Sequence, residues 1–222
     1  MQGVQMVVFD MAGTTVNEDN IVYKTLANSI TKYGYTVALE TVLIHGAGKE
    51  KLQAIKDILV FLGEETTKAS EIFKDFKETL ETSYKTMDVF AFDSAKEIFE
   101  KLRGKNIKVV LNTGYDVKTA TLLLDRLNWA IGNDIDLLVT ASDVERSRPH
   151  GDMIFLAMEK LAIENAEAVI KIGDSAIDIE EGKNANCGAT VGITTGAQTK
   201  EQLAIANPNY IINDLKELLE II

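Results

Sequence analysis

The sequence predicts an α/β fold, with a doubly wound parallel-sheet core and an inserted α-helical cap. Three observations lead to this prediction: apolar runs rich in valine and isoleucine recur along the chain, helical patterns lie between them, and one block of helices interrupts the alternation. Strands covered on both faces are apolar at consecutive positions. Strands that alternate with helices form a mostly parallel sheet with right-handed crossovers.

Five apolar runs are the predicted strands of the core, and each ends at small or polar residues. In chain order they are VQMVVFD (4–10), IKVVLN (107–112), DLLVTAS (136–142), AVIKIGD (168–174) and ATVGIT (189–194). Apolar residues at helical spacing predict helices between these runs. These helices cover residues 94–105, 117–127 and 153–161.

The segment after the first strand has a different pattern, because it contains helical spacing without strands. It predicts helices over residues 22–33, 49–62 and 67–85. We interpret this block as a cap over the edge of the sheet. The predicted core covers residues 1–16 and 88–222 and the predicted cap covers residues 17–87, with hinges near 16–19 and 87–92.

The composition indicates a globular enzyme-sized protein and excludes several classes of partner. The chain has 222 residues and a net charge of −11, which disfavours nucleic acid and anionic membranes because both attract basic proteins. No segment approaches the roughly 20 apolar residues of a membrane span. The single cysteine, Cys187, excludes an intramolecular disulfide. We expect a cytoplasmic monomer or homodimer.

Polar residues follow the predicted strands. Ligands bind beyond the carboxyl ends of the strands in an open parallel sheet, so these residues are expected to meet at one edge. They are Asp10, Ala12, Gly13, Thr14 and Thr15, then Asn112, Thr113, Gly114 and Tyr115, then Arg148, Pro149 and His150, and finally Asp174 and Asp178. Carboxylates, hydroxyl groups and an arginine at one edge suit a hard divalent cation such as Mg²⁺ together with a phosphoryl group.

This set of residues also suggests a reaction. An aspartate that is not fully committed to a metal ion can attack phosphorus and give an acyl phosphate, which water then cleaves. Thr14, Thr113 and Gly114 are the candidate phosphate-binding residues, and Arg148 supplies a fixed positive charge.

The stretches DMAGTT, NTGY, RP and GDSAIDIEEG resemble, in this order, the four motifs of the haloacid dehalogenase superfamily, whose capped members also carry a helical insert after the first motif. The resemblance covers nearly the whole chain and implies a haloacid dehalogenase-like core. It also implies a role for each residue that matches a motif. By this resemblance Asp10 is the nucleophile and a magnesium ligand, and Ala12 is a second ligand through its carbonyl. Asp174 and Asp178 are the remaining residues of the metal site. Thr113 and Gly114 bind the phosphate, and Arg148 is the cation that neutralises the nucleophile and the phosphate.

Ala12 departs from the pattern of most phosphatases in the superfamily, which carry an aspartate two residues after the nucleophile. That aspartate protonates the leaving alcohol and then activates water. A methyl group cannot transfer a proton, so the leaving group must be handled differently here.

The setting FDMAGTTV is similar to the phosphonatase branch, in which phosphonoacetaldehyde hydrolases cleave a carbon–phosphorus bond through an imine on a cap lysine. In the stretch HGAGKEKLQAI, Lys49 is the candidate for this lysine, at the start of a predicted helix whose dipole would lower the pKa of the amine. A plain substrate contact by Lys49 remains open, and His45 is a candidate substrate-binding residue.

The sequence therefore predicts a Mg²⁺-dependent hydrolase that removes a phosphoryl group from a small phosphorylated or phosphonate metabolite, through an aspartyl-phosphate on Asp10. Two alternatives stay open. One is a true phosphonoacetaldehyde hydrolase with a Schiff base on Lys49. The other is a phosphate-binding module without activity, in which Ala12 reflects loss of catalysis.

Overall fold

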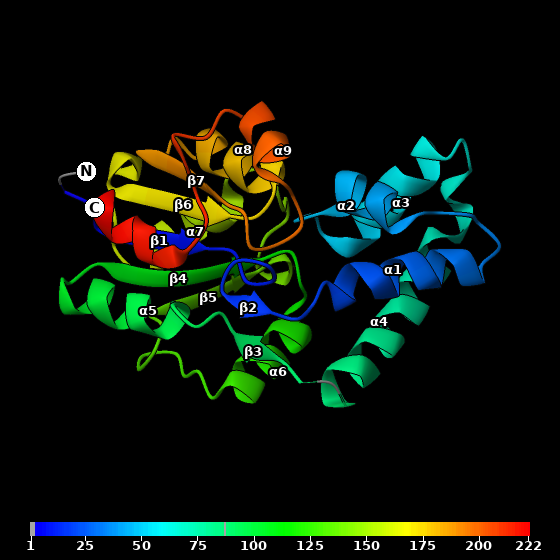
Figure 1. The fold of residues 1–222 in the computed structure, drawn as a ribbon, viewed down its shortest axis with the longest axis horizontal. Coiled ribbons are helices and arrows are strands. Elements are labelled where there is room, and N and C mark those ends of the chain that lie inside the picture. The colour runs from blue at the N-terminus through cyan, green and yellow to red at the C-terminus, as the bar shows by residue number, and fades with distance from the viewer. Residues whose placement is uncertain (1–2, 87) are drawn as a thin grey trace.

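The computed structural model describes residues 3–86 and 88–222 and contains the predicted parallel sheet (Figure 1). Its strands run in the order β5-β4-β1-β6-β7-β8, and all neighbouring pairs are parallel. Their bounds are β1 Met6–Phe9, β4 Lys108–Thr113, β5 Leu137–Thr140, β6 Val169–Gly173, β7 Ala189–Ile193 and β8 Tyr210–Ile212. β1 lies at the centre because it pairs with both β4 and β6.

Helices cover both faces of the sheet, as the doubly wound prediction requires. Successive strand residues point to opposite faces, so Phe9 packs against Phe99 of α5 on one face, with ring centroids 5.3 Å apart. Met6 and Val8 belong to the core of the other face, with Met153 of α7. The core helices are α5 Ala95–Gly104, α6 Val117–Leu127, α7 Asp152–Lys160, α8 Ala176–Asn184 and α9 Lys200–Ile205, with short 3₁₀ helices at 141–143, 166–168 and 215–220.

The helices between β2 and β3 form a bundle at one side of the sheet (Figure 1). They are α1 Ile21–Lys32, α2 Leu39–Gly46, α3 Lys51–Phe61 and α4 Ala69–Thr86, with a 3₁₀ turn at 66–68. β2 (Val16–Asn17) and β3 (Phe90–Ala91) pair antiparallel where the chain leaves and re-enters the core. These strands lie within the two predicted hinges, of which Met87 is outside the described residues. The division into core and cap domains stays a prediction.

The structure differs from the prediction at several elements. The predicted helix 49–62 begins at Lys51 instead, because the Glu50 side chain accepts hydrogen bonds from the N–H groups of Leu52 and Gln53, both at 2.9 Å, and so caps the helix. The strand β8 and the helices α2, α8 and α9 were not predicted. β8 has three residues at the edge of the sheet, too few for a periodic pattern. Within the described residues, no helix is both long and apolar enough to cross a membrane.

Candidate active site

Asp10 ends the central strand at the edge that the sequence predicts for the site. Its backbone N–H donates to the carbonyl of Ile172 in β6 at 2.9 Å, and the Thr15 hydroxyl donates to its carbonyl at 3.0 Å. The side chain is buried, and its Oδ1 accepts a hydrogen bond from Nη1 of Arg148 at 2.8 Å. The carboxylate therefore faces a cation at the strand end, and it is not the cap of α1, whose N-cap position is Asn20 and whose first turn binds the Glu18 carboxylate through the N–H of Val22.

Arg148 joins the separate strand ends into one buried network. Its Nε donates to Oε2 of Glu181 at 2.9 Å, its Nη1 lies 3.1 Å from Oδ1 of Asp178, and its Nη2 donates to the carbonyl of Asn112 at 2.6 Å. Lys171 adds a second buried cation, with Nζ 2.7 Å from Oδ1 of Asp178 and 3.4 Å from Oε2 of Glu181. Burial by itself would raise the pKa of Asp178, but Arg148 and Lys171 hold it below the ordinary value.

Three carboxylates of this network form a cluster that fits a metal ion. Asp10, Asp174 and Asp178 each offer an oxygen, and these oxygens lie within 4.8 Å of one another. Asp174 accepts a hydrogen bond from the N–H of Ala197 on Oδ2 at 2.6 Å, whereas its buried Oδ1 has no hydrogen-bond partner among the residues that the structure describes. A buried oxygen without a partner is costly. A cation bound between the three carboxylates would satisfy it.

The charges in the network support the same fit. Counting Glu181, four buried carboxylates face one arginine and one lysine, so the excess is two negative charges when all groups are ionised. Burial, with the negative charges of Asp10 and Asp178, raises the pKa of Asp174 well above its usual range. Burial also raises the pKa of Asp10. One divalent cation would balance the excess charge, and carboxylate ligands suit a hard cation.

Ala12, Thr113 and Thr14 were also predicted for the site, and the structure places them in different surroundings. Ala12 and Thr113 are buried near the strand ends, and the Thr113 hydroxyl accepts a hydrogen bond from the N–H of Tyr115 at 3.2 Å. Thr14 is also buried, but it lines a separate cavity of about 140 Å³ with Ser94, and its hydroxyl has no partner there. The structure therefore does not place the Thr14 side chain with the carboxylate cluster.

The loop between α2 and α3 meets the core at two glycines. The carbonyl of Gly48 accepts a hydrogen bond from Nη1 of Arg148 at 3.2 Å, the same nitrogen that binds Asp10. A Cβ placed on Gly114 would lie 2.7 Å from the carbonyl oxygen of Lys49 and 3.0 Å from that of Gly48. Only glycine allows such a close approach of the two backbones. The cap loop is therefore docked directly onto the site.

The two cap residues predicted from this loop point away from the carboxylates. The Lys49 amine forms an ion pair with Asp57 at 2.5 Å, on the side of α3. The His45 ring packs on Phe61, with centroids 4.0 Å apart. Their predicted roles are not tested by these contacts, but the partners of both side chains lie within the helical insert.

Lys51 is the cap lysine that enters the site. It is 6% exposed, and its amine donates to the carbonyl of Lys49 at 2.6 Å and lies 5.5 Å and 5.6 Å from the ring centroids of Tyr23 and Tyr115. Burial lowers the pKa of this amine to about 8, although the negative charge of Asp10 opposes the shift. Lys51, two residues after the predicted Lys49, is therefore a second candidate for a reactive cap lysine, and the role of Lys49 stays a prediction.

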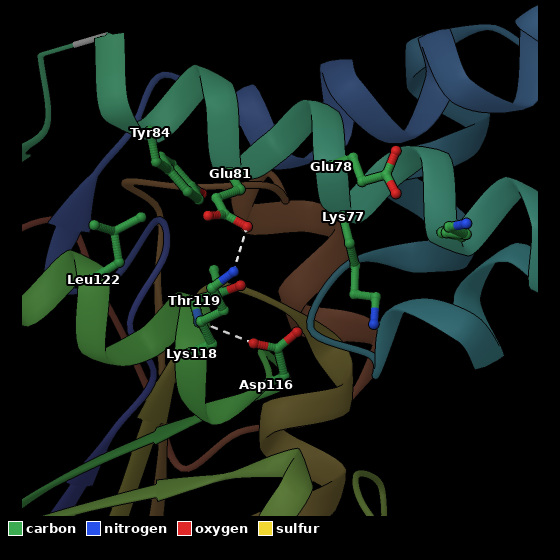
Figure 2. A pocket seen from close by; sticks show the side chains of 9 residues that line it. Lys77, Glu78, Glu81, Tyr84, Asp116, Lys118, Thr119 and Leu122 are labelled. Atoms are coloured by element: carbon green, nitrogen blue, oxygen red, sulfur yellow. Dashed lines mark hydrogen bonds and ion pairs between the residues drawn. The ribbon is translucent and has the colours of Figure 1, made fainter.

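A cavity of about 350 Å³ opens beside Lys51 between cap and core. Its wall includes Gly114 and Tyr115 from the core and Phe73, Phe76 and Lys77 from α4. A second cavity of about 310 Å³ shares Lys77, Asp116 and Thr119 with the first. Figure 2 shows this outer part, where Tyr84 and Glu81 of α4 face Thr119 and Lys118 of α6. We refer to these two adjoining cavities together as the cleft.

Three buried charged residues at the site were not predicted: Lys171, Glu181 and Lys51. Two of them leave a signal in the sequence. Lys171 interrupts the apolar run AVIKIGD, and a lysine in a strand buried on both faces requires acidic partners. Glu181 follows Asp178 by three residues, so both project from the same face of α8. Lys51 left no such signal, because Lys49 is equally basic and the helix start was placed too early.

Comparisons with known proteins agree with this arrangement. A family described as Haloacid dehalogenase-like hydrolase matches residues 7–191. The chain is 25% identical to a phosphonoacetaldehyde hydrolase from Bacteroides fragilis, over 98% of this chain and 95% of that protein. It is 23% identical to the pyrophosphatase PpaX from Oceanobacillus iheyensis, over 99% of this chain and 97% of that protein.

Solved structures show the same fold. A hydrolase from Pseudomonas syringae superposes with a TM-score of 0.87 and 21% identity, covering 98% of this chain and 99% of that one. A phosphonoacetaldehyde hydrolase-like protein from Oleispira antarctica superposes with a TM-score of 0.83 and 22% identity, covering 99% of this chain and 91% of that one. At these identities the likeness concerns the fold.

Proposed function

The chain belongs to the haloacid dehalogenase-like hydrolases, and on this premise we propose that it removes a phosphoryl group from a small phosphorylated or phosphonate metabolite through an aspartyl-phosphate on Asp10. The observation that carries the proposal is the buried cluster of Asp10, Asp174 and Asp178 around the guanidinium group of Arg148. A nucleophilic carboxylate, a metal-binding set and a fixed cation are the parts that this reaction requires.

We propose the following roles for the residues. An oxygen of Asp10 attacks phosphorus, and the bond from phosphorus to the leaving group breaks as the acyl phosphate forms. Arg148 holds the Asp10 carboxylate in place and offers positive charge to the phosphoryl oxygens. Thr113 and the backbone at Gly114 line the expected phosphate position, and water then cleaves the acyl phosphate to release phosphate. The docked cap loop excludes bulk water during the first step.

Asp10, the carbonyl of Ala12, Asp174 and Asp178 are the residues proposed to hold Mg²⁺, which would neutralise the carboxylates and polarise the phosphoryl group. The choice of Mg²⁺ rests on the all-oxygen set of ligands. A readout apart from activity is thermal unfolding, since a cation that binds only the folded state raises the melting temperature. Mg²⁺ should stabilise the wild type and should stabilise Asp174→Asn less.

A screen for phosphate release tests the proposal. Small phosphomonoesters and phosphonates are incubated with the protein, with Mg²⁺ or with a chelator. Release from at least one compound that requires the metal, and that is absent in Asp10→Asn, is the expected result. Mass spectrometry of the acid-quenched enzyme should show the phosphoryl group on Asp10. Activity retained in Asp10→Asn would overturn the assignment of the nucleophile.

A second candidate function is favoured by Lys51. Its buried amine, enclosed by Tyr23 and Tyr115, suits imine formation with an aldehyde, as in cleavage of phosphonoacetaldehyde, and a relative of the chain bears that name. Borohydride added with phosphonoacetaldehyde should then trap a reduced adduct on Lys51. The predicted residue Lys49 provides the matched control. An adduct on Lys49 that persists in Lys51→Met would return the role to the predicted position.

The proposal also covers the class of substrate, the location of the protein and its oligomeric state. We propose a small-molecule substrate and a cytoplasmic location, as the composition predicts. A monomer or a homodimer is equally compatible with the cleft, because the site is built from one chain.

A further inference from the structure

A buried carboxyl group that the proposed mechanism does not use lies on the cap side of the site. Glu18, in the segment that links β2 to α1, is 4% exposed. Its Oε2 accepts hydrogen bonds from the N–H of Val22 at 2.9 Å and from the hydroxyl of Tyr84 at 3.1 Å. Both donors are neutral, and within the part of the chain that the structure describes Glu18 forms no direct ion pair. Nothing therefore holds this carboxyl group permanently in its charged form.

Two tyrosines connect Glu18 with the cavity. The hydroxyl groups of Tyr84 and Tyr115 are 2.7 Å apart, and both side chains are buried. Tyr84, on α4, lines the outer part of the cleft (Figure 2). Tyr115 follows Gly114 in the core, lines the inner cavity and contacts the amine of Lys51 through its ring. Glu18, Tyr84 and Tyr115 therefore form a continuous hydrogen-bonded chain from a buried acid to the cavity wall.

This chain joins the helical insert to the core. Glu18 and Tyr84 belong to the helical insert and its linker, whereas Tyr115 belongs to the core, so the hydrogen bond between the two tyrosines spans the boundary between cap and core. A group connected in this way is available when the substrate is enclosed. Hydroxyl groups that accept and donate at once can pass a proton along such a chain.

We infer that Glu18, acting through Tyr84 and Tyr115, supplies the proton to the leaving group and takes a proton from the attacking water, the task that Ala12 cannot perform. The inference rests on the proposed function. In this proposal the leaving group lies in the cavity that Tyr115 lines and takes its proton from that residue. Glu18 and Tyr84 are positioning residues that act through Tyr115.

The two half-reactions balance along this chain. When the bond between phosphorus and the leaving oxygen breaks, that oxygen takes the proton of Tyr115. Tyr84 gives its proton to Tyr115, and the Glu18 carboxyl group gives its proton to Tyr84, which leaves Glu18 as a carboxylate. When water attacks the phosphorus of the acyl phosphate, its proton returns by the same three groups. Asp10 is released as a carboxylate and Glu18 is protonated again.

The electrostatic setting of Glu18 suits a group that works in both directions. Burial raises its pKa to about 7, although the hydrogen bonds from Val22 and Tyr84 and the positive charge of Lys51 oppose the rise. An acid–base group is most effective when its pKa is near the working pH. Burial also raises the pKa values of Tyr84 and Tyr115 well above their usual range, so both remain neutral hydroxyl groups.

A structural role for Glu18 is the alternative, because its carboxylate also binds the first turn of α1 at Val22. Glu18→Gln separates the two roles. The amide keeps the size and the acceptor oxygen, so the contacts to Val22 and Tyr84 can persist, but it cannot take up and release a proton. Tyr84→Phe breaks the chain at its middle and leaves the Glu18 contact with Val22 intact.

The experiment compares two probes in the presence of Mg²⁺: 2-phosphoglycolate, whose alkoxide needs a proton to leave, and p-nitrophenyl phosphate, whose phenolate leaves without one. In Glu18→Gln, rapid mixing with p-nitrophenyl phosphate should give a fast burst of phenolate followed by slow turnover. The turnover is slow because water attacks the phosphorylated Asp10 without a base to take its proton. With phosphoglycolate, phosphorylation itself should fall by about 10²-fold, the usual contribution of such a group. Tyr84→Phe should behave in the same way.

Tyr33→Phe is the matched control, since the Tyr33 hydroxyl also bonds across helices, to the carbonyl of Glu71 at 3.3 Å, but on the surface. It should keep wild-type rates with both probes. If Glu18→Gln and Tyr84→Phe slow the phosphorylation step equally with both probes, or slow no step with either probe, while the wild type is active, Glu18 serves only the helix and the inference is wrong. If the phosphate-release screen identifies another alkyl phosphate as the better substrate, that compound replaces 2-phosphoglycolate. A wild type that releases phosphate from no compound of that screen overturns the proposed function instead.

Discussion

The two sides of the site are built differently. On the core side, charged groups at the strand ends satisfy one another: Arg148 and Lys171 lie among carboxylates within 3.4 Å. On the cap side, Lys51 and Glu18 are each buried and form no direct ion pair with any residue that the structure describes, and their neighbours are tyrosines and backbone. The core side is fixed by its own charges and is the side proposed to perform the chemistry at phosphorus. The cap side keeps groups whose protonation can change, which suits the role in leaving-group protonation that we infer for it.

The largest effect is expected from removing the nucleophile on the core side. Asp10→Asn keeps the size of the side chain and an acceptor for Arg148, so the protein should fold. The asparagine cannot form the acyl phosphate, and turnover should fall by about 10³-fold or more. Steady-state phosphate release measures the loss. Folding is checked by near-ultraviolet circular dichroism.

The next effect concerns the stability of the same side. Arg148→Met leaves the buried carboxylates of Asp10, Asp178 and Glu181 without their shared cation, which should lower the free energy of unfolding by about 3–5 kcal/mol. The matched control is Arg146→Met. Arg146 makes a two-bond ion pair with Asp152 at the surface, so its loss should cost less than about 1 kcal/mol. Urea titrations measure the free energy of unfolding of both variants. Equal losses in Arg148→Met and Arg146→Met would contradict the view that the core side depends on its buried charges.

On the cap side, Glu18 predicts a pH dependence of stability. Its pKa is raised from 4.5 in the unfolded chain to about 7 in the folded protein. Between these values the folded protein retains a proton that the unfolded chain has lost, so the contribution of Glu18 is full below pH 4.5 and is lost as the pH rises through 7. The loss should be up to about 3 kcal/mol. Glu18→Gln should flatten the wild-type curve between pH 5 and 8 in urea titrations.

The two neighbouring cap lysines sharpen the comparison further. Lys51→Met should lower kcat/KM for the natural class of substrate by about 10²-fold, because the buried amine lies at the cavity wall. Lys49→Met breaks only the partly exposed pair with Asp57 and should change kcat/KM by less than about threefold. Steady-state kinetics on the best compound of the phosphate-release screen shows which of the two substitutions lowers kcat/KM more. The reverse order would restore the predicted role of Lys49.

The smallest effect is expected from an ion pair between cap and core at the surface. Lys118 of α6 binds Glu81 of α4 at 2.6 Å across the mouth of the cleft (Figure 2). Because Lys118 is 73% exposed, Lys118→Ala should change the free energy of unfolding by less than about 1 kcal/mol. The change should also vanish in high salt. A larger, salt-independent loss in urea would show that the cap side depends on charge as the core side does.

The core side could be predicted from the sequence to a large extent, because strand ends of a parallel sheet must share an edge. Asp10, Arg148, Asp174 and Asp178 come together as expected. Thr14 was expected with them, but it follows the turn after Asp10 and lines another cavity. A strand end locates a backbone position, and the turn that follows decides the direction of each side chain.

The cap side could not be predicted in the same way. Its residues meet through packing between helices, and helical periodicity alone does not fix which helices pack or in what register. The predicted helix start at residue 49 missed one local detail, the capping of α3 by the Glu50 side chain, so Lys51 was not considered, and the role of Lys49 stays a prediction. Glu18, Tyr84 and Tyr115 lie far apart along the chain, and neither the acid nor the tyrosines stand in a pattern that marks them.

The close contact of Gly48 with Gly114 has a consequence for how this protein could diversify. Since the cap loop meets the core through main-chain atoms, the depth to which it closes does not depend on which side chains surround the cavity. Residues of the cavity wall that are at least partly exposed, such as Phe73 and Lys77, can then be exchanged without loosening this contact. A gene duplicate could acquire a new substrate by altering one helix surface while it inherits the reaction unchanged.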